Sequence, residues 1–159
     1  MELLLMNREH LDGVEALERL CFVEPWSAKA LALLIGDGAF AFVCTEGDDV
    51  IAYGGMLTVL DEGQVTNIAV HPDHRRCGLG KRIVSEMLDE GIRRGLNEIS
   101  LEVRASNIAA VRLYEQNGFV CAGIRRNFYK QPTEDALVMI RTLTSSDGEK
   151  TFERIGAGN

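Results

Sequence analysis

The fold is decided by the stretch Asn67-Ile68-Ala69-Val70-His71-Pro72-Asp73-His74-Arg75-Arg76-Cys77-Gly78-Leu79-Gly80-Lys81. Its apolar start is typical of a strand, which the pair His71-Pro72 ends. From Leu79 to about Arg94, apolar residues recur at helical spacing. The loop between strand and helix contains glycines and basic side chains. Such a loop can turn backbone N–H groups towards an anion at the positive end of a helix, and a pyrophosphate is its natural ligand.

Two better-known phosphate loops do not match this stretch. A Walker A loop would need glycine at Arg75 and a hydroxyl side chain at Arg82. The dinucleotide fingerprint would need a third glycine where Ile83 stands. Taken alone, the loop is equally well interpreted as a glycine-rich turn with solvated arginines.

Outward from this loop, strands and helices account for most of the chain. Strands are expected at Leu3–Met6, Phe40–Thr45, Val50–Leu60, Gln64–Val70, Ile99–Val103, Phe119–Ile124 and Ala136–Leu143. Helices are expected at Leu11–Cys21 after the cap Asn7, at Ala28–Ile35, at Leu79–Arg94 and at Ile108–Asn117. The order predicts an α/β (α+β) fold, a mixed central sheet of about seven strands with about four helices. We expect residues 1–143 to form one domain and the polar, glycine-rich residues 144–159 to form a flexible tail.

Composition restricts the function. The chain has 159 residues, 46% hydrophobic and 26% charged, as a globular domain does. Its 17 Lys and Arg against 24 Asp and Glu give a net charge of -7, which disfavours nucleic acid as a partner and is compatible with a basic peptide. No apolar run approaches the roughly 20 residues of a membrane span, and the start lacks a signal peptide. We therefore expect a cytoplasmic protein.

The cysteines and histidines do not suggest a metal site. Cys21, Cys44, Cys77 and Cys121 stand far apart, without a C-x-x-C pair, which fits a reducing compartment. His71 and His74 flank a proline turn and are not at the spacing that presents two imidazoles from one helix face. No metal is expected.

The pattern Arg-x-x-Gly-x-Gly, following a strand and Val70-x-Pro72, resembles the acetyl-CoA loop of the GNAT superfamily of N-acetyltransferases. The resemblance covers about Leu3 to Leu143. Further segments resemble the RimI-type ribosomal-protein-alanine N-acetyltransferases, namely Pro25-Trp26-Ser27, Asn67-Ile68-Ala69-Val70, Leu101-Glu102-Val103-Arg104-Ala105-Ser106-Asn107, Leu113-Tyr114-Glu115-Gln116-Asn117-Gly118-Phe119 and Ile124-Arg125-Arg126-Asn127-Phe128-Tyr129. The resemblance implies transfer of acetyl from acetyl-CoA to the N-terminal alanine of a ribosomal protein.

The resemblance also assigns roles. An α-amine with a pKa near 8 is mostly ammonium at neutral pH, so a base is required; Glu102 resembles the catalytic glutamate, acting directly or through water. Tyr114 resembles the acid that protonates the leaving thiolate, a role that suits a phenol. The backbone N–H of Val70, on the segment Ile68-Ala69-Val70, is the candidate oxyanion donor.

The remaining site residues bind the two substrates. Cofactor-binding candidates are Ile68, Ala69, Val70, Arg76, Cys77, Gly78, Leu79, Gly80, Lys81 and Asn107, and Trp26 and Tyr129 are candidate walls of the acceptor site. Ordinary structural interpretations stand beside these: a surface position for Glu102, a core aromatic beside Phe119 for Tyr114, a helix cap for Asn107, and simple packing for Trp26 and Tyr129.

Two alternative functions keep the cofactor loop. One is a GNAT enzyme for lysine side chains or a small-molecule amine, because the fold alone does not choose the substrate. The other is a non-catalytic CoA-binding module, against which Glu102 and Tyr114 argue. The oligomeric state is left open by the sequence.

Overall fold

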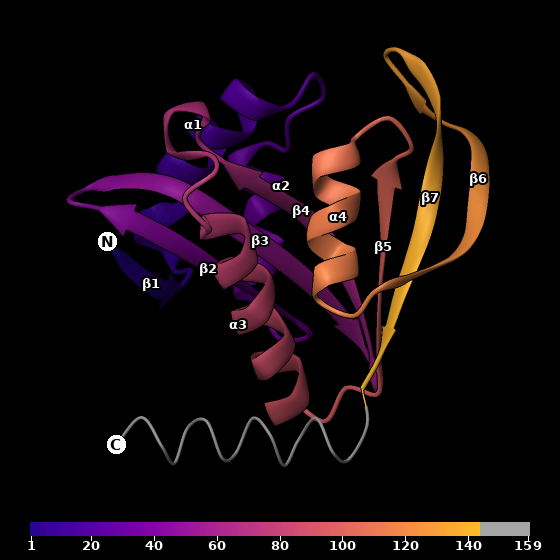
Figure 1. Cartoon of the computed structure of the whole chain (residues 1–159). Helices are drawn as coiled ribbons and strands as arrows, with labels where there is room; N and C mark the ends of the chain where they lie inside the picture. Colours follow the sequence, from indigo (N-terminus) through magenta and orange to yellow (C-terminus); the bar gives the residue numbers. More distant parts are fainter. Residues whose placement is uncertain (144–159) are drawn as a thin grey trace. The chain divides into compact units, whose positions relative to one another are not determined.

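The computed structural model describes residues 1–143, and the tail expected at 144–159 lies outside the described residues. Its strands form one seven-stranded sheet in the order β1-β2-β3-β4-β5-β7-β6 (Figure 1). The elements are β1 (Glu2–Leu5), α1 (Leu11–Cys21), α2 (Ala28–Leu31), β2 (Ala39–Glu46), β3 (Asp49–Val59), β4 (Glu62–Val70), α3 (Leu79–Arg93), β5 (Glu98–Arg104), α4 (Ile108–Gln116), β6 (Val120–Lys130) and β7 (Thr133–Thr142). The predicted mixed sheet with about four helices is confirmed.

The chain divides into two compact units. The first comprises Met1–Thr58 with Val65–Met87, and the second comprises Val59–Gln64 with the described residues from Leu88 to Leu143. Strand β4 contributes to both. Its start, Glu62–Gln64, pairs in parallel with β5, whereas β1 with β2, β2 with β3, β5 with β7 and β6 with β7 are antiparallel pairs.

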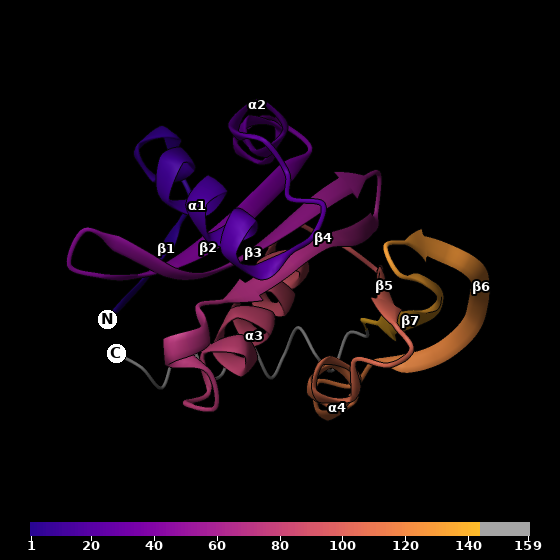
Figure 2. The ribbon, with the colours of Figure 1, turned by 90° about the horizontal axis from the view of Figure 1, so that it is seen from above.

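In the first unit, α1 and α2 lie on one face of the strands and α3 on the other (Figure 2). Two adjacent glycines of β3 allow this close packing, because neighbouring residues of a strand face opposite ways. A Cβ at Gly54 would lie 2.6 Å from both Ile83 Cγ2 and Met87 Sδ of α3, and a Cβ at Gly55 would lie 2.7 Å from Leu34 Cδ1. The core on the α1 side contains Met6, Val14, Leu17, Leu31, Leu34, Ala39, Ala41, Val43, Tyr53 and Ala69.

In the second unit, α4 lies beside β5 in both views (Figures 1 and 2). Burial alternates along β5: Ile99, Leu101 and Val103 are buried, and the residues between them are half-buried. The strand therefore has one face in the core, and Glu102 is on the other face.

Several of the elements differ in their bounds from those expected. Strand β6 extends to Lys130 instead of ending at Ile124. It lies at the edge of the sheet, and its polar residues face solvent. After a register shift, its pairing with β7 resumes at Tyr129, which lies opposite Glu134. The helix expected at Ala28–Ile35 is α2 followed by a 3₁₀ turn over Ala32–Ile35, a common way for a short helix to end. Asn7 caps a 3₁₀ turn that precedes α1.

None of the helices within residues 1–143 combines the length and the apolar character that a bilayer span needs.

We predict that Gly54→Ala destabilises the fold, because the added methyl group meets two side chains of α3 at less than contact distance. Overpacking of this kind costs about 1–3 kcal/mol of unfolding free energy, measurable by urea denaturation. The control is Gly123→Ala in β6, where a Cβ would have no heavy atom within 4 Å and the change should stay within about 0.5 kcal/mol. Equal losses in the two variants would contradict this account of the packing.

Candidate active site

The turn from β4 into α3 forms a loop of basic residues, Arg75–Lys81, which we call the anion loop. Two of its residues adopt left-handed backbone conformations, Arg76 with φ 66° and Gly78 with φ 83°. Arg75 Nε donates a 3.0 Å hydrogen bond to the carbonyl of Val70, which ties the loop to the end of β4. Helix α3 then begins at Leu79, so its free N–H groups lie at the end of the loop.

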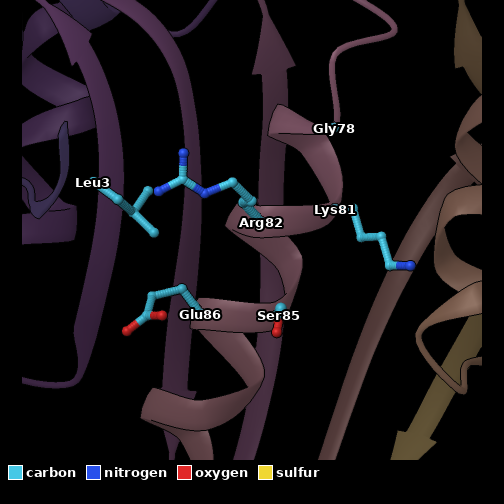
Figure 3. Close-up of a pocket in the computed structure, with 6 residues that line it drawn as sticks. All are labelled: Leu3, Gly78, Lys81, Arg82, Ser85 and Glu86. Atoms are coloured by element: carbon cyan, nitrogen blue, oxygen red, sulfur yellow. The ribbon is translucent and has the colours of Figure 1, made fainter. Parts of the chain in front are cut away.

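Positive charge is concentrated here in a chain of net charge -7. The side chains of Arg75, Arg76, Lys81 and Arg82 are all exposed. In Figure 3, Arg82 extends towards Leu3 of β1 and Lys81 points the opposite way from the first turn of α3. A pocket of about 350 Å³ is lined here by Leu3, Gly78, Lys81, Arg82, Ser85 and Glu86. Cationic side chains and the positive helix end together suit a phosphate group.

Not every predicted cofactor residue offers its side chain. Leu79 is 3% exposed and Ala69 is 4% exposed, so these two can offer only backbone groups to a ligand. Cys77 is exposed, and its thiol lies 2.6 Å from the carbonyl of His74. The carbonyl of Val70 already accepts from Arg75 and from the thiol of Cys21.

Glu102 lies half-buried on β5, with 15% of its side chain exposed. Gln64 Nε2 of β4 donates to its Oε2 at 3.2 Å. The guanidinium of Arg125 on β6 lies 3.5 Å from its Oε1 and is largely exposed. One carboxylate oxygen is therefore held by a neutral amide, and the other faces a solvent-exposed cation.

Tyr114 and Tyr129 complete a cluster with Glu102 in the second unit. Burial, and secondarily the neighbouring Tyr129, raises the pKa of Tyr114 above its ordinary value. Burial first, and then the charge of Glu102, raises the pKa of Tyr129, while Arg104 opposes the rise. The Arg104 guanidinium lies 4.3 Å from the centre of the Tyr129 ring. Both phenols therefore keep their protons at neutral pH.

Several residues also have the structural roles that the sequence left open. Asn107 Oδ1 accepts from Ala110 N at 3.2 Å and so caps α4. The ring of Tyr114 packs edge-on against Phe119, with centroids 5.7 Å apart. Trp26 packs against the core of the first unit. The binding roles of Asn107 and Trp26 and the catalytic role of Tyr114 stay predictions.

The two histidines of the turn, His71 and His74, contact a backbone N–H of the turn and a surface carboxylate, respectively. His71 Nδ1 accepts from Asp73 N at 3.1 Å, and His74 Nε2 lies 3.7 Å from Glu46 Oε2. Within residues 1–143, no group of three or more His, Cys, Asp or Glu residues is arranged to hold a metal ion.

Sequence reasoning did not identify Gln64 and Arg125 as partners of Glu102. Gln64 was expected to begin a strand, and Arg125 was noted only as part of a segment that resembles the RimI-type enzymes. Their contacts depend on the β4–β5 and β5–β7–β6 pairings, which are not evident from local sequence. Alternation along each strand predicts which face a residue occupies but not its partner.

Known proteins were compared with the chain. The model of the acetyltransferase (GNAT) family matches residues 11–119. The [ribosomal protein bS18]-alanine N-acetyltransferase of Escherichia coli (strain K12) is 42% identical over 127 residues, 77% of this chain and 84% of that protein. The enzyme of the same name from Salmonella typhimurium is 39% identical over 137 residues, 85% of this chain and 93% of that protein.

Solved structures agree with the sequence comparisons. The crystal structure of the ribosomal-protein-S18-alanine N-acetyltransferase from Escherichia coli aligns with a TM-score of 0.83 at 36% identity, covering 90% of this chain and 94% of that one. A chain of the NatC complex bound to Gag peptide and CoA aligns with a TM-score of 0.77 at 24% identity, covering 91% of this chain and 100% of that one, and so shares the fold. The chain thus belongs to the acetyltransferase (GNAT) family.

Proposed function

We propose that this enzyme transfers the acetyl group of acetyl-CoA to the α-amine of an N-terminal alanine, with the ribosomal protein bS18 as its substrate in the cytoplasm. The substrate is suggested by relatives that are 42% and 39% identical. The observation that carries the reaction type is the cluster of Glu102, Tyr114 and Tyr129, which combines a proton acceptor with a buried, protonated phenol.

Acetyltransferases of this family use acetyl-CoA. We place its pyrophosphate on the anion loop, where Arg76, Lys81 and the backbone N–H groups of Gly78, Leu79 and Gly80 would neutralise and bind it. The exposed Cys77 would lie against the same group. The backbone of Ile68–Val70 and the side chain of Asn107 would bind the pantetheine arm, and Asn107 would share its oxygen with the cap of α4.

Acetyl transfer begins with loss of a proton from the substrate ammonium. Glu102 accepts this proton, directly or through water, and Gln64 holds the second carboxylate oxygen in place. The ammonium competes with Arg125 for the same carboxylate. Because Arg125 is largely exposed, its ion pair is weak and is readily displaced by a bound substrate.

The neutral amine then attacks the thioester carbonyl. A C–N bond forms, and the negative charge on the carbonyl oxygen is stabilised by the N–H of Val70. As the C–S bond breaks, Tyr114 gives its proton to the sulfur, so that CoA leaves as a thiol. The second proton of the attacking nitrogen then passes to the Tyr114 phenolate, directly or through water, which leaves a neutral amide and restores the phenol. Trp26 and Tyr129 would form walls that favour a small first residue, since steric exclusion is worth about 1–3 kcal/mol per methylene.

The direct test compares acetylation of three matched hexapeptides. One begins with a free alanine, one begins with a bulky residue, and one has a blocked N-terminus and contains lysine. We expect strong preference for the free alanine, read by mass spectrometry. Equal turnover of the blocked lysine peptide would favour a lysine acetyltransferase, and binding of acetyl-CoA without any transfer would favour the non-catalytic module.

We predict that Glu102→Gln and Tyr114→Phe lower kcat by about 10²-fold or more while acetyl-CoA binding, measured by calorimetry, is unchanged. General acid or base catalysis by one side chain contributes this order of magnitude. Arg76→Ala is the matched comparison, because it should weaken acetyl-CoA binding and leave the chemical step intact. Wild-type turnover in both Glu102→Gln and Tyr114→Phe would refute the assigned roles.

We predict a rise of kcat/KM with pH up to about 8, because the free α-amine there loses its proton and can attack without the unfavourable proton transfer to Glu102, and we predict that kcat/KM does not fall again below about pH 10. An acid must be protonated to act, and its raised pKa moves any alkaline fall to higher pH. The measurement is the pH–rate profile with the alanyl peptide. A fall centred below about pH 10 that disappears in Tyr114→Phe would show that the pKa of Tyr114 is not raised.

A further inference from the structure

Helix α1 carries a carboxylate into the core of the first unit. Among residues 1–143, Glu18 is the charged residue that is fully buried, at 0% exposure. It shares the inward face of α1 with Val14 and Leu17, both also buried. A buried charge is costly unless donors satisfy it, so this residue requires an explanation.

Three donors from different parts of the unit surround the Glu18 carboxylate. The Tyr53 hydroxyl of β3 and the Asn67 amide of β4 both donate to Oε1, the latter at 2.8 Å. The backbone N–H of Trp26 donates to Oε2 at 3.2 Å. An ionised carboxylate only accepts, so all three bonds suit the charged form. Burial and the charge of Glu18 raise the pKa of Tyr53, which keeps the phenol a donor.

The bond to Trp26 holds the backbone of the loop between α1 and α2. Residues 22–27 connect α1 with α2. A second α1 carboxylate, Glu15, accepts from the backbone N–H of Ala28 at the end of this loop. Two carboxylates of one helix therefore hold the backbone on either side of Ser27. The ring of Trp26 is placed by this backbone anchor and by its packing against the core.

The same carboxylate reaches β4 through Asn67. Asn67 directly precedes the segment Ile68–Val70, to which the proposed function gives the oxyanion donor. Glu18 thus connects the loop that carries Trp26 to the strand that carries Val70. A shift of either element would break a charge-assisted hydrogen bond, and such bonds are about twice as strong as neutral ones.

We infer that Glu18 is a positioning residue for the acceptor peptide, because it holds the Trp26 loop in register with β4 through Tyr53 and Asn67. This inference rests on the proposed function, in which Trp26 is a wall of the acceptor site. It goes beyond that function by assigning peptide affinity to a side chain that no substrate can touch. The anion loop has no hydrogen bond to Glu18 among those described, and the backbone of Ile68–Val70 is also held by the place of β4 in the sheet, so acetyl-CoA affinity should depend on Glu18 much less than peptide affinity does.

The experiment measures KM for the alanyl peptide and for acetyl-CoA in Glu18→Gln. Removal of the charge weakens the bonds and leaves at least one donor facing an amide N–H₂ group. We expect the peptide KM to rise by about tenfold, the order that a hydrogen bond to a charged group supports, and the acetyl-CoA KM to change by less than about twofold. Tyr53→Phe removes one donor and keeps the carboxylate, and it should give a smaller rise in the same direction.

The control is Asp12→Asn, which removes an exposed carboxylate from the same helix and should leave both KM values unchanged. A merely structural role for Glu18 would lower the unfolding temperature without separating the two KM values. The inference is overturned if folded Glu18→Gln and Tyr53→Phe keep the wild-type peptide KM, or if both KM values rise together. Should Glu18→Gln fail to fold, Tyr53→Phe decides.

Hydrogen–deuterium exchange separates this inference from the proposed function. Peptic fragments covering residues 22–28 should exchange faster in Glu18→Gln, and fragments covering 75–82 should be unchanged. If the wild-type enzyme acetylates no peptide, the proposed function fails, and the exchange result still tests whether Glu18 holds the loop. Unchanged exchange over 22–28 in the folded variant contradicts the positioning role.

Discussion

The close approach of α3 to β3 is the constraint on which the first unit depends. Gly54 has no side chain, so Ile83 and Met87 of α3 can lie directly against the strand. This contact fixes the position of α3 against the strand and therefore the place of its positive end. The residue after Gly54 faces the opposite side and makes room for Leu34 in the same way. Both layers of the unit are thus packed around two neighbouring glycines of one strand.

Charge is divided between the two units according to the chemistry that each would perform. In the first unit, exposed cations at the start of α3 offer a site for an anion on a chain whose net charge is -7. In the second, Glu102 and the buried phenol of Tyr114 are the groups to which the proposed mechanism gives the proton transfers. The exposed guanidinium of Arg125 pairs only weakly with Glu102, so the carboxylate stays accessible to a substrate amine. Substitutions in different units can consequently impair cofactor binding and proton transfer separately.

The sequence predicted most of the elements because their patterns are local. Alternating burial along β5 and the helical stripe of α3 follow directly from residue spacing. The end of β6 was missed because its polar residues look like a turn until β7 pairs with them. The roles of Glu102 and Tyr114 came from family resemblance; by periodicity alone one is a surface residue and the other a core aromatic.

Side-chain contacts between different strands of the sheet could not be predicted from the sequence. Arg125 and Gln64 meet Glu102 only through strand pairing, which residue spacing does not reveal. Glu18 is different, because its spacing of four from Val14 puts a carboxylate on the apolar face of α1. A charge on such a face is a recognisable signal of a buried polar network, although its donors from β3 and β4 could not be named in advance.

The measurement that tests the central claim most directly is a crystal structure with a bisubstrate analogue, in which CoA is joined through an acetyl bridge to the nitrogen of an alanyl peptide. The account predicts that the pyrophosphate lies on the anion loop, that the alanine nitrogen lies within hydrogen-bond or one-water reach of Glu102, and that the sulfur lies beside the Tyr114 hydroxyl. Arg125 should have left the carboxylate. An alanine nitrogen far from Glu102, or a sulfur with no contact to Tyr114, would contradict the account.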